Sequence, residues 1–176
     1  LLLTVGVIGC GYWGPNLIRN FINLKDAEVK IASDLDEGRL EHMKRLYPSL
    51  ATTTDYTEII KDDSIEAVVI ATPVSTHYPL AAAALEAGKH VFCEKPLTQS
   101  VEEGVKLVDL ADEKDRTLMV GHTFVYTAAV NTVKDLINSG ELGDIYYMST
   151  ARVNLGLFQE DINVVWDLAP HDVSIM

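Results

Sequence analysis

The sequence has little positive charge, almost no cysteine and no long hydrophobic run. Its 176 residues hold 14 lysines and arginines against 26 aspartates and glutamates, a net charge of −12. Because nucleic-acid binding depends on basic residues that neutralise phosphates, this balance argues against a nucleic-acid partner. No stretch of about 18 consecutive apolar residues occurs, so the sequence predicts no membrane-spanning segment. An anionic substrate would need a local basic site.

The two cysteines, Cys10 and Cys93, lie in or beside apolar, strand-like stretches and form neither a disulfide framework nor a zinc-ligand pattern. They favour a reducing, cytoplasmic location and predict no metal site. The apolar start LLLTVGVIG has no basic residue before it and no A-x-A-type cleavage site, so we expect no signal peptide. With 48% hydrophobic and 23% charged residues, the composition is typical of a globular protein.

Apolar, strand-like stretches alternate with helical patterns over residues 1–121. We predict strands at residues 4–9, 28–34, 66–72, 90–96 and 117–122. We predict helices at residues 15–24, 37–47, 76–88 and 101–113, and a short helix that follows the threonines of TTTDYTEII. This alternation indicates an α/β fold in which helices cover both faces of a doubly wound parallel sheet.

The pattern changes after His122. TAAVNTVKDLINSG predicts an amphipathic helix that ends at Gly140, and residues 145–153 alternate as a strand does. VVWDLAPHDVSIM indicates a further helix. Because a lone strand is not stable by itself, we expect residues 122–176 to begin a second α/β domain, most of which is absent from this chain. The alternative is a small lobe that packs on the first domain.

Gly9, Gly11 and Gly14 form a G-x-G-x-x-G pattern between a predicted strand and a predicted helix, and Asp34 follows 20 residues after Gly14. This spacing indicates a Rossmann-type dinucleotide site, in which the glycines allow a tight turn, approach of a pyrophosphate and close helix packing. Asp34 would accept hydrogen bonds from the adenosine ribose and repel a 2′-phosphate, which favours NAD over NADP. The alternative is a phosphate-free turn. The predicted cofactor residues of this turn include Tyr12 and Trp13.

The loop ATPVSTH follows the next central strand and would lie at the same ligand-binding edge of the sheet. We predict that Thr72, Pro73 and His77 contact the cofactor. Ordinary turn chemistry is the alternative for Thr72, and solvent exposure or helix capping is the alternative for His77.

The strand HVFCEKPL ends in the charged pair Glu94 and Lys95. Lys95 is placed to donate to a substrate hydroxyl or to stabilise a developing alkoxide. Pro96 would make the turn rigid, with a cis peptide bond as one route. A solvated Glu–Lys pair is the alternative.

Asp167 and His171 are four residues apart in WDLAPHD, which places them one turn apart on a helix. Such a pair suits a carboxylate that orients an imidazole general base. Because Pro170 belongs in a first helical turn, Asp167 is alternatively expected just before the helix or as its N-cap.

Together these segments resemble the Gfo/Idh/MocA family of NAD(P)-dependent oxidoreductases. The matching stretches are GVIGCGYWG, Ser33-Asp34, ATP at residues 71–73, EAGKHVFCEKPL and the D-x-x-x-H of residues 167–171. The resemblance covers essentially the whole chain, and its E-K-P motif is more specific than its glycines. It implies a dinucleotide-binding domain at residues 1–121, the start of a substrate and oligomerisation domain at residues 122–176, and a homo-oligomer in the full-length form.

The resemblance also implies how the residues act on a sugar or nucleotide-sugar. His171 would take the hydroxyl proton, Lys95 would hold that oxygen and Asp167 would orient His171, while a hydride passes to the nicotinamide of NAD. Glu94 and Thr72 would line the nicotinamide side. Further candidate substrate contacts are Arg152, Asn154 and Trp166.

Two other functions stay open. One is an NAD-using glycosidase of the same family, which shows no net redox change. The other is a non-catalytic dinucleotide-binding module. HTFVYTAAV keeps Tyr126 but lacks the arginine and proline that often occur there in the family, so the resemblance does not carry a substrate contact over to this segment.

Overall fold

The computed structural model describes residues 2–153 and 162–176. Contacts within the chain divide it into two units, Leu1–Val120 (unit 1) and Gly121–Met176 (unit 2). Within the described ranges, no helix is both long and apolar enough to cross a membrane.

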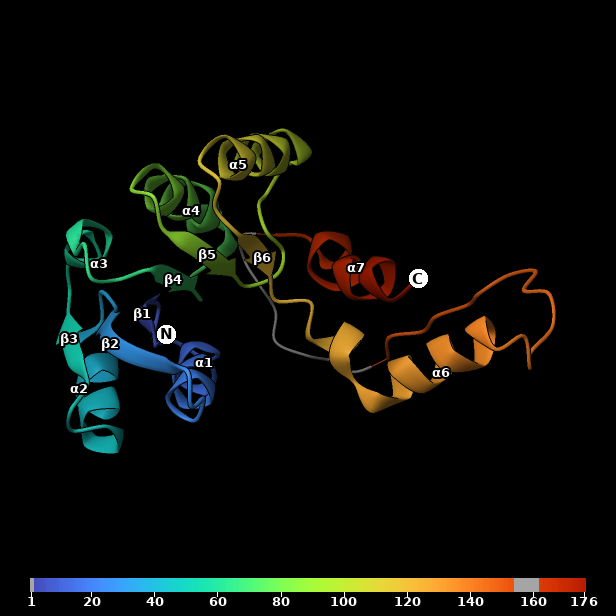
Figure 1. Ribbon diagram of the computed structural model, residues 1–176, viewed down its shortest axis with the longest axis horizontal. Coiled ribbons are helices and arrows are strands. Elements are labelled where there is room, and N and C mark those ends of the chain that lie inside the picture. Colours follow the sequence, from blue (N-terminus) through green and yellow to red (C-terminus); the bar gives the residue numbers. More distant parts are fainter. Residues whose placement is uncertain (1, 154–161) are drawn as a thin grey trace. The chain divides into compact units, whose positions relative to one another are not determined.

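Unit 1 is built on a sheet of six parallel strands in the order β3-β2-β1-β4-β5-β6 (Figure 1). The chain begins in the middle of the sheet, runs out to β3, and then returns to β4 and continues to β6. The strand order therefore reverses between β1 and β4, which is where ligands bind in sheets of this kind. The predicted Rossmann-type sheet is confirmed. Its strands are β1 (Leu3–Ile8), β2 (Ala27–Ser33), β3 (Ala51–Thr53), β4 (Ala67–Ile70), β5 (His90–Cys93) and β6 (Leu118–Val120).

Helices cover both faces of this sheet because its central strands are apolar on both sides. On β4, Val68 and Ile70 belong to one buried cluster and Val69 belongs to the other. Helices α1 (Gly14–Ile22) and α2 (Glu37–Leu46) supply the cluster around Val69, while the opposite cluster draws on α3 (Thr57–Lys61), α4 (His77–Glu86) and α5 (Val101–Glu113). Each fully buried valine or isoleucine contributes about 1.5–3 kcal/mol, so this double burial fixes the layers.

The short strand β3 was not predicted, because the TTT stretch was assigned to the start of a helix. Ala51, Thr52 and Thr53 instead pair with the end of β2. A three-residue edge strand is too short to show a period of two, and only its pairing partner identifies it. The helix that follows, α3, is correspondingly short, with five residues.

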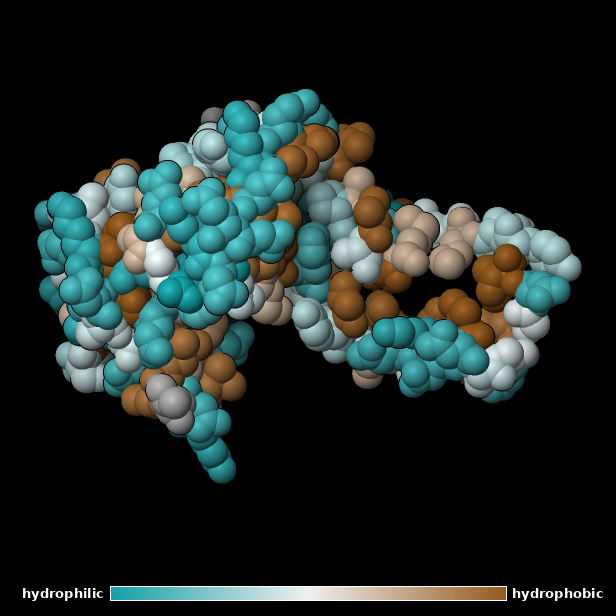
Figure 2. Space-filling model, turned by 45° about the horizontal axis from the view of Figure 1, so that its top comes forward, coloured by the Kyte–Doolittle hydropathy of each residue, from teal (hydrophilic) through white to brown (hydrophobic). Residues whose placement is uncertain are grey.

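In unit 2, the described elements are helical: a 3-10 turn (Thr123–Tyr126), α6 (Ala128–Asn138) and α7 (Val164–Ile175). The strand predicted at residues 145–153 is wrong, because these residues have no regular secondary structure. Their alternation had suggested a strand, but among the described residues no second strand pairs with them, and a strand needs a partner. Tyr146 and Met148 are consequently exposed by 90% and 54%. Figure 2 shows hydrophobic side chains at the surface of this unit.

Candidate functional site

Four neighbouring strands of unit 1 end level with one another. Ile8 at the end of β1 pairs with Ser33 of β2 and with Ile70 of β4, and Ile70 pairs with Cys93 of β5. The segments that follow these residues therefore start side by side at the carboxyl edge of the sheet. They are the glycine turn, Asp34, the Thr72 loop and the Glu94 turn. The site residues predicted in unit 1 are thus brought to one edge.

The glycine turn explains why three of its positions carry no side chain. Gly9 has φ +101°, a region that favours glycine, and a Cβ there would collide with the carbonyl oxygen of Ala71. A Cβ on Gly14 would collide with the carbonyl oxygen of Gly9. Around Gly11, by contrast, the nearest atom to an added Cβ is the Arg39 guanidinium at 3.4 Å. A Cβ at Gly11 would thus contact only the end of one long side chain and no backbone atom. The fold itself therefore does not require glycine there, which fits a position kept bare for a group that must approach the backbone.

Helix α1 begins directly after this turn. Its N-cap residue, Trp13, makes no side-chain hydrogen bond to the first turn, and Pro15 stands at the helix start. The backbone N–H groups of the first turn thus have no side-chain cap, which suits an anion at this end of the helix. Trp13 stacks on Tyr12 with ring centroids 6.3 Å apart. Both rings reach solvent, Tyr12 with 79% exposure and Trp13 with 39%.

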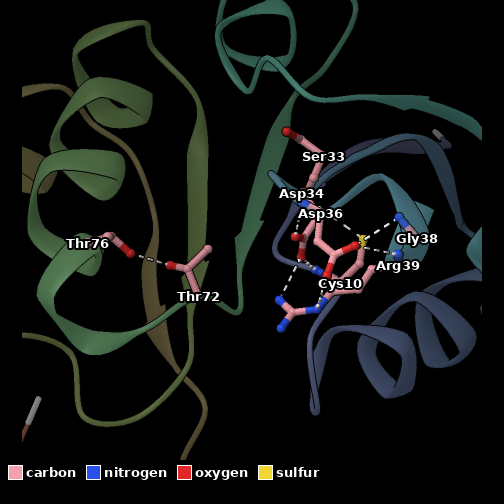
Figure 3. A network of polar contacts seen from close by, with 8 residues as sticks. All are labelled: Cys10, Ser33, Asp34, Asp36, Gly38, Arg39, Thr72 and Thr76. Atoms are coloured by element: carbon pink, nitrogen blue, oxygen red, sulfur yellow. Dashed lines mark hydrogen bonds and ion pairs between the residues drawn. The ribbon is translucent and has the colours of Figure 1, made fainter. Parts of the chain in front are cut away.

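Asp34 fastens the glycine turn to the end of β2 (Figure 3). Its Oδ2 accepts a hydrogen bond of 2.7 Å from the backbone N–H of Cys10, and its Oδ1 accepts one of 2.9 Å from Asp36. The side chain is only 7% exposed. The residue predicted to bind the ribose therefore also holds the turn that would cradle the pyrophosphate.

Arg39 lies beside this carboxylate and was missed in the sequence. Its Nη1 is 3.5 Å from Asp34 Oδ2, and its Nε is 3.7 Å from Asp36 Oδ2. Asp36 caps α2 by accepting from the backbone N–H groups of Gly38 at 2.8 Å and of Arg39 at 3.3 Å. The available signal is an arginine five residues after Asp34, the acid predicted to bind the ribose, because an arginine near that acid accommodates the 2′-phosphate in NADP sites.

The Thr72 loop is closed by side chains from the start of α4. Thr76 Oγ1 lies 2.7 Å from both Thr72 Oγ1 and the carbonyl oxygen of Pro73. His77 is 1% exposed, and its ring nitrogens lie 2.9 Å from the carbonyl oxygens of Thr72 and Pro96. The exposed alternative for His77 is therefore wrong. Its ring nitrogens face the backbone of two loops rather than a ligand position.

The turn after β5 carries Glu94 and Lys95. The Lys95–Pro96 peptide bond is cis, which confirms the cis bond suggested by the sequence. Burial raises the pKa of Glu94, while hydrogen bonds from the Lys95 backbone and the Trp13 side chain and the Lys95 charge act in the opposite direction. Among the described residues, Glu94 Oε1 has no hydrogen-bond partner although it is buried. The Trp13 bond links this turn to the glycine turn.

In unit 2, Asp167 and His171 lie one turn apart within α7. The helix begins at Val164, and Asn163 is its N-cap, accepting from the Trp166 backbone N–H at 3.0 Å. Asp167 therefore lies inside the helix, and the alternative that placed it before the helix or at its N-cap is wrong. That alternative assumed that Pro170 stands in the first turn, whereas α7 accommodates it in its interior. His171 is 8% exposed, and the ring of Phe124 meets it edge-on with centroids 4.7 Å apart.

Arg152 is held within the same unit rather than presented freely. Its Nε donates to Asp172 Oδ2 at 2.9 Å, and its guanidinium lies 5.1 Å from the centre of the Phe124 ring.

The predicted catalytic residues are divided between the two units of the chain. Burial lowers the pKa of His122, which follows directly after the first residue of unit 2. Asn154, another predicted substrate contact, lies outside the described residues. Lys95 belongs to unit 1, whereas Asp167 and His171 belong to unit 2.

Comparison with known proteins places this geometry in context. Residues 3–122 match the model of the GFO_IDH_MocA oxidoreductase family, which has an NAD-binding Rossmann fold. The chain is 34% identical over 164 residues to a scyllo-inositol 2-dehydrogenase (NADP(+)) of Bacillus subtilis, covering 93% of the chain and 44% of the relative. It is 31% identical over 162 residues to the glycosyl hydrolase family 109 protein 1 of Shewanella sp. (strain ANA-3), covering 87% and 35%.

A solved structure is also similar. GenD2 from gentamicin A biosynthesis, in complex with NAD, superimposes with a TM-score of 0.76 at 30% identity, covering 80% of this chain and 40% of that one. The chain spans about a third to a half of the length of these relatives. With the family model matched over most of its length, the chain belongs to the Gfo/Idh/MocA oxidoreductase family and carries its NAD-binding Rossmann fold.

Proposed function

We propose that this chain supplies the NAD-binding half of a dehydrogenase that acts on a CH–OH group of a sugar or nucleotide-sugar. The observation that carries the proposal is the carboxyl edge of the sheet. There the glycine turn, the Thr72 loop and the Glu94 turn start level, and Asp34 is bonded to the backbone of the glycine turn. Together with the family membership, this supports unit 1 as the dinucleotide-binding domain and unit 2 as part of the substrate domain.

The residues of this edge fit NAD. The missing side chain at Gly11 and the uncapped start of α1 suit the pyrophosphate, and Asp34 suits the ribose hydroxyls. When bound, NAD supplies the nicotinamide that exchanges a hydride with the substrate carbon. Asp34 disfavours a 2′-phosphate by charge repulsion, although Arg39 beside it partly offsets this. We therefore assign NAD as the preferred cofactor, with Tyr12, Trp13, Thr72, Pro73 and Glu94 as further contacts.

The substrate chemistry falls to Lys95, His171 and Asp167. Lys95 holds the reacting hydroxyl oxygen with its ammonium group, and His171 accepts the hydroxyl proton. Asp167, one turn earlier on α7, orients His171 and stabilises its charged form. We assign Arg152 to the support of Phe124 and His171, because Asp172 already holds its guanidinium. Trp166 and Asn154 remain predicted substrate contacts.

A second candidate is an NAD-dependent glycosidase, which the relative named glycosyl hydrolase family 109 protein 1 favours. The two activities differ in their redox balance. A dehydrogenase accumulates NADH as the sugar is oxidised, whereas a glycosidase of this kind releases a leaving group without net NADH. The homo-oligomer and the cytoplasmic location stay predictions.

Calorimetric titration of this chain with NAD tests the proposal at its first step. We expect the parent chain to bind NAD saturably. Asp34→Ala should weaken this binding at least about tenfold, because it removes one charge-assisted hydrogen bond. Asp109→Ala, which removes an exposed carboxylate on α5, is the matched control and should bind like the parent. Absence of NAD binding by the folded parent would refute the proposal.

Turnover is the second test. On a panel of sugars and polyols, Lys95→Ala and His171→Ala should each abolish any NADH production that the parent shows. Parent and variants that are equally inert yet bind NAD would instead favour a non-catalytic dinucleotide-binding module.

A further inference from the structure

We infer that His77 is a buried imidazolium ion that ties the Thr72 loop to the Pro96 turn. Its Nε2 lies 2.9 Å from the Thr72 carbonyl oxygen, and its Nδ1 lies 2.9 Å from the Pro96 carbonyl oxygen. The residue is 1% exposed, so water cannot replace either partner. His77 is thus a positioning residue for two of the four segments that start at the carboxyl edge of the sheet, the Thr72 loop and the Glu94 turn that contains Pro96.

The charge follows from what the two partners can do. A carbonyl oxygen only accepts hydrogen bonds, so each ring nitrogen must donate to be satisfied. A neutral imidazole has one N–H and would point the lone pair of its other nitrogen at a carbonyl oxygen. Such a buried, unsatisfied contact is unfavourable, whereas the doubly protonated ring satisfies both oxygens.

Charges around His77 act in both directions. His77 is the first residue of α4, where the helix dipole disfavours a cation, and Lys95 on the adjoining turn does the same. Carboxylates on the elements packed around α4 favour the cation: Glu94 stands on that turn, Glu86 ends α4, and α5 carries five carboxylates. The one lysine of α5 opposes them. Tyr78 on α4 and His90 and Cys93 on β5 are the other titratable groups of these elements.

The contact between His77 and the Pro96 carbonyl oxygen also positions Lys95, the lysine proposed to hold the substrate hydroxyl. Pro96 directly follows Lys95, so the ring that holds the Pro96 carbonyl also determines where the Lys95 backbone lies. The same ring holds the carbonyl of Thr72, a predicted nicotinamide contact. The role of Lys95 rests on the proposed function, whereas the charge state of His77 does not.

His90 provides an internal contrast within unit 1. The backbone N–H of Thr117 donates to His90 Nδ1 at 3.0 Å. His90 must therefore keep a lone pair on Nδ1, which makes it a neutral ring with its hydrogen on Nε2. Two histidines of one domain are thus expected in opposite protonation states under the same conditions.

Long-range ¹H–¹⁵N correlation spectra of the ¹⁵N-histidine-labelled chain at pH 7.5 test the charge. We expect two protonated ring nitrogens for His77 and the neutral Nε2–H pattern for His90. His77→Gln and His90→Gln assign the signals. If His77→Gln does not fold, single glutamine variants of the other four histidines assign His77 by elimination. A neutral pattern for His77 would overturn the inference.

The positioning role has a separate readout. His77→Gln should shift the backbone amide signals of both the Thr72 loop and the Pro96 turn, and it should weaken NAD binding about tenfold. The matched variant His90→Gln should leave NAD binding unchanged. Unaltered amide signals in both segments would refute the positioning role. A parent chain that fails to bind NAD would refute the proposed function and leave the charge of His77 standing.

Discussion

Replacing Asp34 with serine should reverse the cofactor preference. In the parent, the Asp34 carboxylate would accept charge-assisted hydrogen bonds from the ribose hydroxyls, each contributing about 1.5–3 kcal/mol. Serine keeps at most a neutral hydrogen bond, so we expect NAD affinity to fall about 10- to 100-fold. The same change removes a negative charge that opposes a 2′-phosphate.

The gain for NADP comes from the charge that Asp34→Ser unmasks. Two unit charges 4 Å apart near a protein surface interact by about 4 kcal/mol, and screening by salt reduces this. Arg39 is half exposed, and its Nη1 loses the carboxylate at 3.5 Å, so its guanidinium becomes free to pair with the phosphate. With both effects discounted for solvent, we expect NADP affinity to rise about tenfold and the NADP-to-NAD ratio to change by about 10²–10³.

Calorimetric titrations with both cofactors measure this ratio, and Arg39→Ala in the Asp34→Ser background is the control. The double variant should lose most of the NADP gain. Serine also leaves the Cys10 N–H without its 2.7 Å acceptor, which costs about 1–3 kcal/mol of stability. Urea denaturation must therefore accompany the titrations. An unchanged ratio in Asp34→Ser, or tighter NADP binding by the parent, would refute the charge argument.

Three further predictions concern the strand-end loops and the nearby core. Gly14→Ala places a Cβ against the Gly9 carbonyl oxygen, so urea denaturation should show a free energy of unfolding lower by about 1–3 kcal/mol. Calorimetry should show that the variant no longer binds NAD. Burial raises the pKa of Glu94, so its ionisation lowers stability as the pH rises above the ordinary carboxyl range. Glu94→Gln should therefore raise the urea midpoint at pH 8 and leave it unchanged at pH 4. Burial raises the pKa of Cys10 to about 12, so mass spectrometry should find Cys10 unmodified by iodoacetamide at pH 8 until the chain is unfolded.

Local patterns predicted the sheet and the glycine turn because the physics behind them is local. Continuous apolar runs mark strands buried on both faces, and a glycine with φ +101° is required wherever the chain turns as it does at Gly9. The spacing from the glycine turn to Asp34 is predictable for the same reason, because the parallel strand β2 must end at the same edge of the sheet as β1. These features depend on residues close in sequence or on one βα repeat.

Contacts between loops could not be predicted in the same way. His77 lies 19 residues from Pro96, and nothing in the sequence around it indicates that one of its ring nitrogens contacts the Pro96 carbonyl oxygen, which follows another strand. The 145–153 error has a different cause. The alternation predicts a strand only if a partner strand exists, and among the described residues no strand pairs with this stretch. Arg39 is not among the predicted site residues, because the sequence assigns the Asp34 carboxylate to the ligand and shows no partner for it within the chain.

Asp34 shows why the residues that bind a cofactor are difficult to separate from those that hold its site. Its carboxylate accepts hydrogen bonds from the backbone N–H groups of Cys10 and Asp36, so a substitution disturbs the glycine turn as well as the proposed ribose contact. A lower NAD affinity alone therefore says little about recognition. NAD and NADP share the pyrophosphate and the turn that would cradle it, so damage to the turn weakens both alike and cancels in their ratio. The ratio isolates the charge of Asp34, and only a change in the ratio assigns discrimination to it.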